Sequence, residues 1–98
     1  MTPLRRAREL LTDPAHWTQG GDARTSMGER TSALDPAATC WCLEGSLVAC
    51  RATRRDFRQL DRAVRDRSRN SWITAFNDNR SHAEVLAVLD DAIAKETP

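Results

Sequence analysis

The sequence predicts a single domain, residues 1–98, of the mainly α (α+β) class, with about four helices around one core and a small β-hairpin or long loop between the first two. Three observations support this fold class. Apolar residues recur at intervals of three and four in several segments, which is the pattern of amphipathic helices. Two of these segments begin with residues that cap helices. Residues 15–38, in contrast, are rich in glycine, serine and threonine, which favour turns.

The first helix is expected to begin at Thr2. A threonine side chain can accept hydrogen bonds from the free N–H groups of the first turn, and a proline at the first helical position loses no hydrogen bond. Leu4, Ala7, Leu10 and Leu11 then recur at helical spacing, until "TDP" at residues 12–14 interrupts the pattern. These features predict a short amphipathic helix.

Residues 15–38 follow this helix and show no helical spacing. A turn is expected near residues 26–29, where serine and glycine lie close together. Since long loops without regular structure are uncommon in small domains, the segment is interpreted as a two-stranded hairpin or a functional loop.

The second helix is expected over residues 40–52, and it contains the motif "CWCLEG". Its apolar residues cover most of the helix circumference, which is typical of a buried helix. Gly45 costs about 1 kcal/mol in a helix interior relative to alanine. We therefore expect another element to cross close to Gly45.

A third helix is expected over residues 53–69, with Phe57, Leu60 and Val64 as its apolar stripe. Its opposite side carries arginines that fall within an arc of about 100° if the helical phase continues from Arg51. We call this set the arginine face. Its seven members are Arg51, Arg54, Arg55, Arg58, Arg62, Arg65 and Arg69.

The C-terminal part contains a short apolar turn or helix and a last helix. Trp72 and Phe76 are four residues apart in the short segment, which is the spacing of two core residues on one helix face. Ser81 and Glu84 form an S-x-x-E capping box, so the last helix is expected to begin there.

Composition limits the classes of function and location. No apolar run reaches the roughly 20 residues of a membrane helix, and the N-terminal segment lacks the apolar core of a secretory signal, so a cytoplasmic protein without membrane contact is expected. The three cysteines are an odd number, which favours free thiols over disulfides. Cys40 and Cys42 do not have the spacing of zinc ligands, so neither a metal nor a cofactor is expected.

The order of four motifs resembles a family of small uncharacterised proteins from actinobacteria and their bacteriophages. The motifs are "TPLRRARELLTDPAHWTQG", "CWCLEGSL", "WITAFND" and "HAEVLAVLDDAIA". The family pattern of a cysteine followed three residues later by glycine is matched by Cys42 and Gly45, and its Asn-Asp pair by Asn77 and Asp78. The resemblance implies a shared fold and a phage-type ancestry, and it names no reaction.

A small cysteine-dependent hydrolase or transferase is one alternative that the residues leave open. Cys42 would be the nucleophile, with its pKa lowered at a helix N-terminus, and His82 and Asn77 would be the base and the group that orients it. The chain lacks the sequence context of cysteine proteases, and its size leaves little room for a substrate cleft. The sequence therefore favours a function without catalysis.

The arginine face is the main candidate binding site. Its guanidinium groups can form paired hydrogen bonds with phosphates or carboxylates, or they can simply be solvated. Because the net charge is only +1, an acidic host protein is the favoured partner, and a nucleic-acid-binding module is the alternative. We therefore expect a phage or prophage accessory protein that binds a host macromolecule, with its oligomeric state left open.

Overall fold

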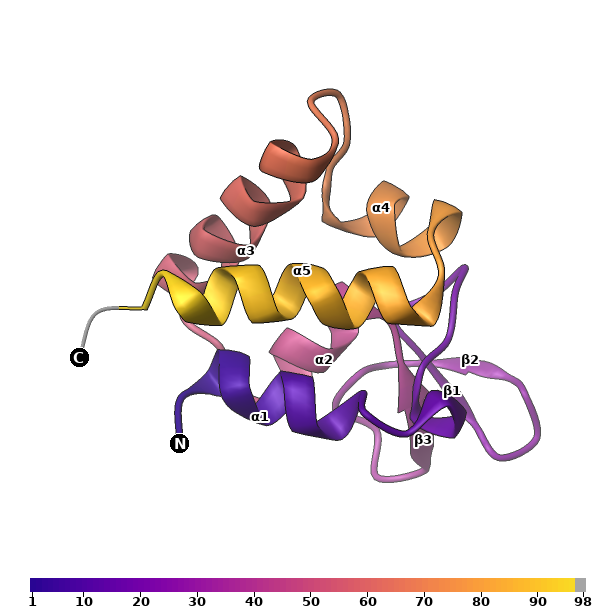
Figure 1. Ribbon diagram of the computed structural model, residues 1–98. Coiled ribbons are helices and arrows are strands. Elements are labelled where there is room, and N and C mark those ends of the chain that lie inside the picture. Colours follow the sequence, from indigo (N-terminus) through magenta and orange to yellow (C-terminus); the bar gives the residue numbers. More distant parts are fainter. Residues whose placement is uncertain (97–98) are drawn as a thin grey trace.

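The computed structural model describes residues 1–96 and contains five α-helices, one short 3-10 helix and a small sheet (Figure 1). The elements follow in the order α1 (Pro3–Leu10), η1 (Pro14–His16), β1 (Ala23–Thr25), β2 (Arg30–Thr31), β3 (Ala38–Trp41), α2 (Leu43–Ala49), α3 (Arg54–Arg67), α4 (Ile73–Asn79) and α5 (His82–Ala94). The α+β class predicted from the sequence is confirmed. No helix in this described part is both long and apolar enough to span a bilayer.

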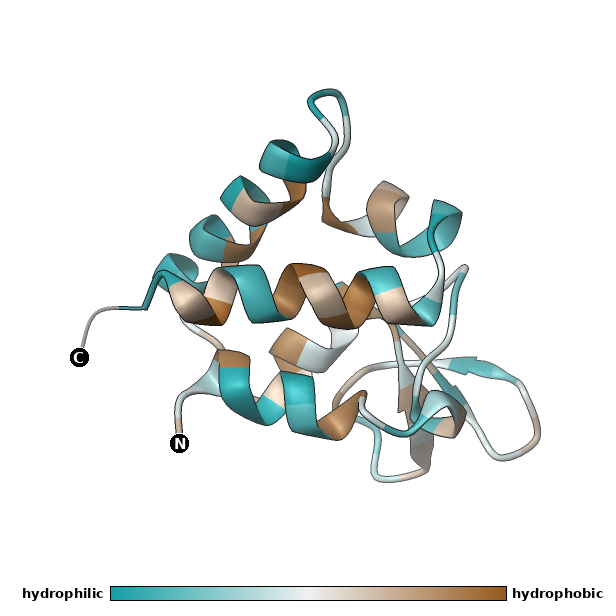
Figure 2. Cartoon of the chain, in the orientation of Figure 1, coloured by the Kyte–Doolittle hydropathy of each residue, from teal (hydrophilic) through white to brown (hydrophobic). Residues whose placement is uncertain are grey.

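Helix α5 lies at the centre of the helical part. Figure 1 shows it crossing in front of α2 and α3, and both α1 and α3 pack against it. Helix α2 contacts α1 on one side and α4 on the other, and the sheet lies at the end of the molecule away from the chain termini. Brown, hydrophobic residues are concentrated on α5, whereas the outer side of α3 is hydrophilic in Figure 2.

One cluster of apolar side chains joins all five helices. Its buried members are Leu4, Ala7, Leu11, Leu43, Leu47, Leu60, Ala63, Val64, Phe76, Val85, Val88, Leu89 and Ala92. Leu43 and Leu47 are fully buried, which confirms that α2 is a core helix, while Cys50 just after it is only partly buried. Each large aliphatic side chain in such a core contributes about 1.5–3 kcal/mol relative to its exposed state.

Threonine and serine hydroxyls cap three of the α-helices. Thr2 accepts a hydrogen bond from the Arg5 N–H at the start of α1, as predicted. Ser81 and Glu84 form the predicted capping box of α5. Helix α3 has a capping box of its own at Thr53, so this threonine precedes the helix rather than belonging to it.

The segment between α1 and α2 forms a three-stranded antiparallel sheet with the order β2-β1-β3. The predicted hairpin turn is present, with the Thr25 N–H donating to the Glu29 carbonyl at 2.9 Å and Gly28 at a φ of 81°. The third strand, β3, was not predicted. Its last two residues, Cys40 and Trp41, are ones that the sequence assigned to the first turn of the second helix, and that prediction is wrong.

Helix α2 begins later than the sequence predicted, because the preceding residues form β3 and pair with β1. Sequence periodicity cannot reveal this contact. Cys40 lies opposite Arg24 in this ladder, and Cys42 keeps an extended backbone as the residue that caps α2. Cys40 therefore lies on a strand and not at a helix end.

Gly45 lies where the segment that leads into β1 crosses α2. A Cβ atom on Gly45 would lie 2.0 Å from the carbonyl oxygen of Asp22, which is far inside van der Waals contact. That same oxygen accepts a hydrogen bond from the Cys42 N–H at 3.0 Å, which fixes the approach. The predicted close crossing at Gly45 is confirmed.

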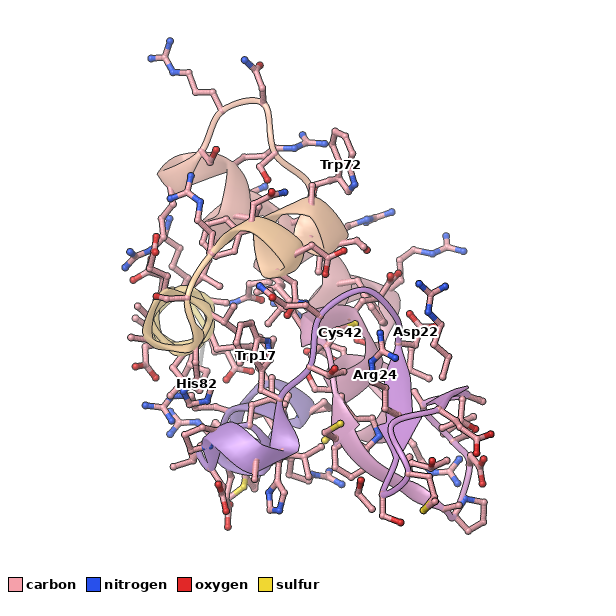
Figure 3. All side chains as sticks on the ribbon, turned by 90° about the vertical axis from the view of Figure 1, so that its right-hand side faces the viewer. Trp17, Asp22, Arg24, Cys42, Trp72 and His82 are labelled. Atoms are coloured by element: carbon pink, nitrogen blue, oxygen red, sulfur yellow. The ribbon has the colours of Figure 1, made fainter. Side chains whose placement is uncertain are left out.

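The short apolar segment after α3 is a full helix, α4, so the molecule has five helices rather than about four. Phe76 is buried at 1% exposure, but Trp72 is 63% exposed and points away from the body of the protein in Figure 3. Trp72 has an extended backbone as the residue before α4, so it does not share a helix face with Phe76. The prediction that both residues are core anchors is wrong for Trp72.

Candidate binding site

The arginine face is present on α3 in a shortened form. Five members lie within α3, and their spacing places them within an arc of about 100°. Arg51 lies outside the helix, because it has a left-handed backbone with a φ of 57° that separates α2 from α3. Arg69 follows the end of α3. The prediction that one helical phase runs continuously from Arg51 to Arg69 is therefore wrong at both ends.

Most of these arginines form no ion pair within the part of the chain that the structure describes. Within residues 1–96, no hydrogen bond or ion pair involves the side chains of Arg54, Arg55, Arg58 and Arg62. Two neighbouring basic residues, in contrast, do form ion pairs. Arg65 pairs with Asp61 at 3.2 Å, and Lys95 pairs with Asp66 at 2.9 Å. The first part of α3 therefore carries four guanidinium groups that pair with no carboxylate of residues 1–96.

Three of the unpaired arginines line a groove of about 280 Å³, which we call the arginine groove. Arg55, Arg58 and Arg62 contribute from α3, and Lys95 contributes from the residue after α5. Gln59 completes the lining, and its side-chain N–H donates to the Ala92 carbonyl at 3.1 Å. This hydrogen bond ties α3 to α5 at the groove, so the cationic groups are presented on two packed helices.

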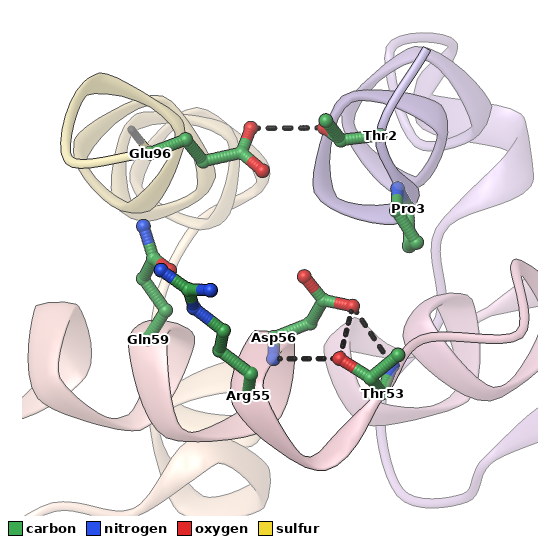
Figure 4. Close-up of a pocket in the computed structure, with 7 residues that line it drawn as sticks. All are labelled: Thr2, Pro3, Thr53, Arg55, Asp56, Gln59 and Glu96. Atoms are coloured by element: carbon green, nitrogen blue, oxygen red, sulfur yellow. Dashed lines mark hydrogen bonds between the residues drawn. The ribbon is translucent and has the colours of Figure 1, made fainter. Parts of the chain in front are cut away.

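A second hollow of about 290 Å³ shares Arg55 and Gln59 with the arginine groove (Figure 4). We call it the acidic cleft, because the carboxylates of Asp56 and Glu96 extend into it from opposite sides. It lies between the starts of α1 and α3 and the segment after α5. Two hollows of opposite charge are therefore adjacent on one surface.

Hydrogen bonds fix both carboxylates of the acidic cleft. Asp56 is 9% exposed, and its Oδ2 accepts from the Thr53 N–H at 2.8 Å and from the Thr53 hydroxyl at 2.9 Å. Its other oxygen points into the cleft in Figure 4. Glu96 accepts a hydrogen bond from the Thr2 hydroxyl at 2.9 Å. The carboxylates are thus held in place before any ligand arrives.

Asn77, the candidate orienting residue, is fully buried and joins three segments of the chain. Its Oδ1 accepts from the Trp17 indole N–H at 2.7 Å and from the Leu43 N–H at 3.0 Å. Its Nδ2 donates to the Thr18 carbonyl at 3.0 Å and to the Asp78 carboxylate at 3.1 Å. These four hydrogen bonds use both the acceptor and the donor group of the amide, so Asn77 has a structural role.

His82, the candidate base, lies at the start of α5 against Trp17 (Figure 3). The two ring centroids are 5.5 Å apart, with an angle of 48° between the planes. Its Nε2 lies 2.6 Å from the carbonyl oxygen of Leu11, which can only accept, so Nε2 carries the proton. This hydrogen bond anchors α5 to the end of α1.

Cys42, the candidate nucleophile, is 2% exposed and its Sγ accepts a hydrogen bond from the Gly45 N–H at 3.2 Å. Burial raises the pKa of the Cys42 thiol to about 11, and the nearby carboxylates of Asp22 and Glu44 raise it further, against the opposing effect of the Gly45 hydrogen bond. The lowered pKa expected from the sequence is therefore wrong, because desolvation outweighs the helix N-terminus. No hydrogen bond within residues 1–96 joins Cys42 to His82.

Among residues 1–96, no group of three or more cysteine, histidine or acidic side chains is arranged to hold a metal ion. The site residues that sequence reasoning missed are Asp56, Gln59, Lys95 and Glu96. Gln59 follows Arg55 by four residues, so helical spacing alone indicates that it shares the arginine side. Lys95 and Glu96 reach the site only because α5 packs on α3 and α1, and the sequence carries no signal of that contact.

Comparison with known protein families gives a match over nearly the whole chain. A profile described as a family of unknown function (DUF6197) matches residues 2–95. No curated protein and no solved structure matches the chain. The comparisons therefore supply no activity, and the function has to be inferred from the site itself.

Proposed function

The chain belongs to this family of unknown function, and we propose that it is a phage or prophage accessory protein that binds a host protein through the arginine face. One observation carries the proposal: four neighbouring arginines on α3 lack any partner within residues 1–96, and three of them line one groove. The phage-type ancestry is suggested by the motif resemblance described above.

The unpaired state of these arginines favours recognition over a structural role. An arginine that stabilises its own fold forms hydrogen bonds within it, as Arg24 does with Thr18, Gln19 and Gly28. The four arginines on α3 form none, so removing one breaks no hydrogen bond within residues 1–96. Their planar donor groups remain available for paired hydrogen bonds with carboxylates or phosphate groups of a partner.

The acidic cleft favours a protein over a nucleic acid as the binding partner. It adjoins the arginine groove, and Arg55 lines both hollows. A nucleic-acid backbone presents only negative charge, so a strand that fills the groove and continues past Arg55 would meet the carboxylates of Asp56 and Glu96. A protein surface carries both signs of charge and can match both hollows. The net charge of +1 agrees with this choice.

The proposal is tested with two charge reversals of equal size. Arg58→Glu changes the arginine face, whereas Arg30→Glu changes an exposed arginine on β2, in the sheet rather than on α3. Partners captured from a nuclease-treated host lysate are identified, and the main one is purified. Its Kd for wild type, Arg58→Glu and Arg30→Glu is then measured at 50 and 300 mM salt.

We expect Arg58→Glu to weaken binding by at least about tenfold, because it removes a charge-assisted contact and adds a repulsive one. Arg30→Glu should bind like wild type. The wild-type affinity should fall with salt, and Arg58→Glu should show less of this dependence. Equal affinities of Arg58→Glu and wild type would show that the arginines are merely solvated, and capture that is lost after nuclease treatment would favour the nucleic-acid alternative.

A further inference from the structure

We infer that the arginine groove binds a phosphate monoester, as presented by a phosphorylated side chain of a protein partner. This inference rests on the proposed function and specifies the chemical group that the groove recognises. Arg55, Arg58 and Arg62 line the groove from α3, and Lys95 lines it from the end of α5.

The spacing of the three arginines suits a single small anion. They occupy positions i, i+3 and i+7 of α3, so they lie along one stripe of the helix. The groove has a volume of about 280 Å³, just below the roughly 300–1,000 Å³ of ligand pockets. It therefore fits one charged group rather than a whole cofactor.

The charge of the groove favours a dianion over a carboxylate. The Lys95 ammonium is already paired with Asp66, so the three guanidinium groups supply the positive charge that remains to be balanced. A carboxylate brings one charge and two acceptor oxygens. A phosphate monoester brings about 1.5 to 2 negative charges and three acceptor oxygens, one for each guanidinium. A phosphodiester has one charge and two free oxygens, so it matches the groove less well.

The surroundings of the groove favour an isolated phosphate over a polyphosphate or a nucleic-acid chain. Asp66 lies beside Lys95 at one side, and the carboxylate of Asp56 lies in the acidic cleft beyond Arg55. A single phosphate on a polypeptide can occupy the groove without placing a second phosphate against either carboxylate. Donor groups of the same polypeptide are then available to Asp56 and Glu96.

The test uses NMR titrations of the 15N-labelled protein with small probes at constant ionic strength. The probes are O-phosphoserine, dimethyl phosphate and acetate, and the arginine Nε–H resonances are observed. We expect saturable shifts of Arg55, Arg58 and Arg62 with O-phosphoserine. Dimethyl phosphate and acetate should bind at least about tenfold more weakly, the effect of losing one charge-assisted hydrogen bond.

Variants separate the groove from general surface charge. The exposed double variant Arg58→Gln/Arg62→Gln should lose saturable O-phosphoserine binding, and Arg30→Gln should keep it. Circular dichroism checks that both variants are folded. Equal binding of acetate and O-phosphoserine, unchanged binding by the double variant, or shifts that never saturate would each overturn the inference.

The source of the phosphate is tested with two larger probes. A ten-residue peptide with one phosphoserine should bind more tightly than a 5′-phosphorylated thymidine decanucleotide. The reverse order would overturn the assignment to a protein partner. None of these titrations needs the host partner, so a failed partner measurement and a failed phosphate titration are separate results.

Discussion

Gly45→Ala should destabilise the protein by about 3 kcal/mol, although alanine is the better helix former. The added Cβ would lie 2.0 Å from the Asp22 carbonyl oxygen, which is a backbone atom and cannot move away by changing a rotamer. We therefore take the strain at the upper end of the usual range for overpacking, about 3 kcal/mol. Displacing Asp22 also weakens its hydrogen bond with the Cys42 N–H, at a cost of about 1 kcal/mol. The higher helix propensity of alanine offsets about 1 kcal/mol of this destabilisation.

Urea unfolding followed by circular dichroism measures this loss. With an m-value near 1.5 kcal/mol/M, a loss of about 3 kcal/mol lowers the unfolding midpoint by roughly 2 M. Gly28→Ala is the matched control, since a Cβ there meets no atom within 4 Å and only the positive φ of 81° opposes it. That control should lose about 1–2 kcal/mol. If Gly45→Ala is no less stable than Gly28→Ala, the steric argument is refuted.

Three further predictions follow from the burial and capping of particular residues. Phe76→Ala should lower the free energy of unfolding by about 3–5 kcal/mol, because Phe76 is buried in the core. Trp72→Ala should change this free energy by less than about 0.5 kcal/mol. Urea unfolding measures both values, and a large loss in Trp72→Ala would contradict the exposed position of Trp72. Ser81→Ala should lower the free energy of unfolding by about 1 kcal/mol in the same assay, because the capping box is lost. An unchanged unfolding midpoint would contradict the capping role of Ser81. Because the folded state raises the pKa of Cys42 to about 11, the unfolded chain loses this proton first as the pH rises, so stability should fall between about pH 9 and 11. From pH 8 to 10, wild type should lose about 1 kcal/mol more than Cys42→Ser, and parallel pH profiles would contradict the raised pKa.

The helices were predictable because their signals are local. Ser81 and Glu84 form a capping box in four consecutive residues, and Thr2 precedes a proline at the first helical position. The periodic apolar residues of α3 and α5 also depend only on neighbours along the chain. Such signals give the type of element and most of its boundaries.

Strand β3 and the exposure of Trp72 depend on contacts that are distant in sequence. An apolar run such as "TCWCL" has no spacing that separates a strand from a buried helix, and its pairing partner, Arg24, lies 16 residues before Cys40. Trp72 precedes α4 by one residue, and a shift of one position removed it from the helix face. Neither outcome can be derived from composition or periodicity.

One part of the binding site could be predicted from local sequence, and another part depends on contacts that are distant in sequence. The stripe of Arg55, Arg58 and Arg62 follows from helical spacing, so the sequence was sufficient to predict it. The acidic cleft and the position of Lys95 arise from the packing of α5 against α1 and α3. The left-handed backbone of Arg51 has no sequence signal either, because this conformation usually falls on glycine or asparagine.

The packing of α1 on α5 has a consequence for the synthesis of the protein. Leu4 and Ala7 are fully buried, yet α5, one of the helices that α1 packs against, is the last element of the described fold to be made. At about 5–20 residues per second, the ribosome needs several seconds to add the residues that separate the two helices. During that time the apolar side of α1 has no α5 to cover it. Nascent chains should therefore expose leucines to chaperones until α5 has left the ribosome, and only then can the two ends of the described fold close through the hydrogen bond between Thr2 and Glu96.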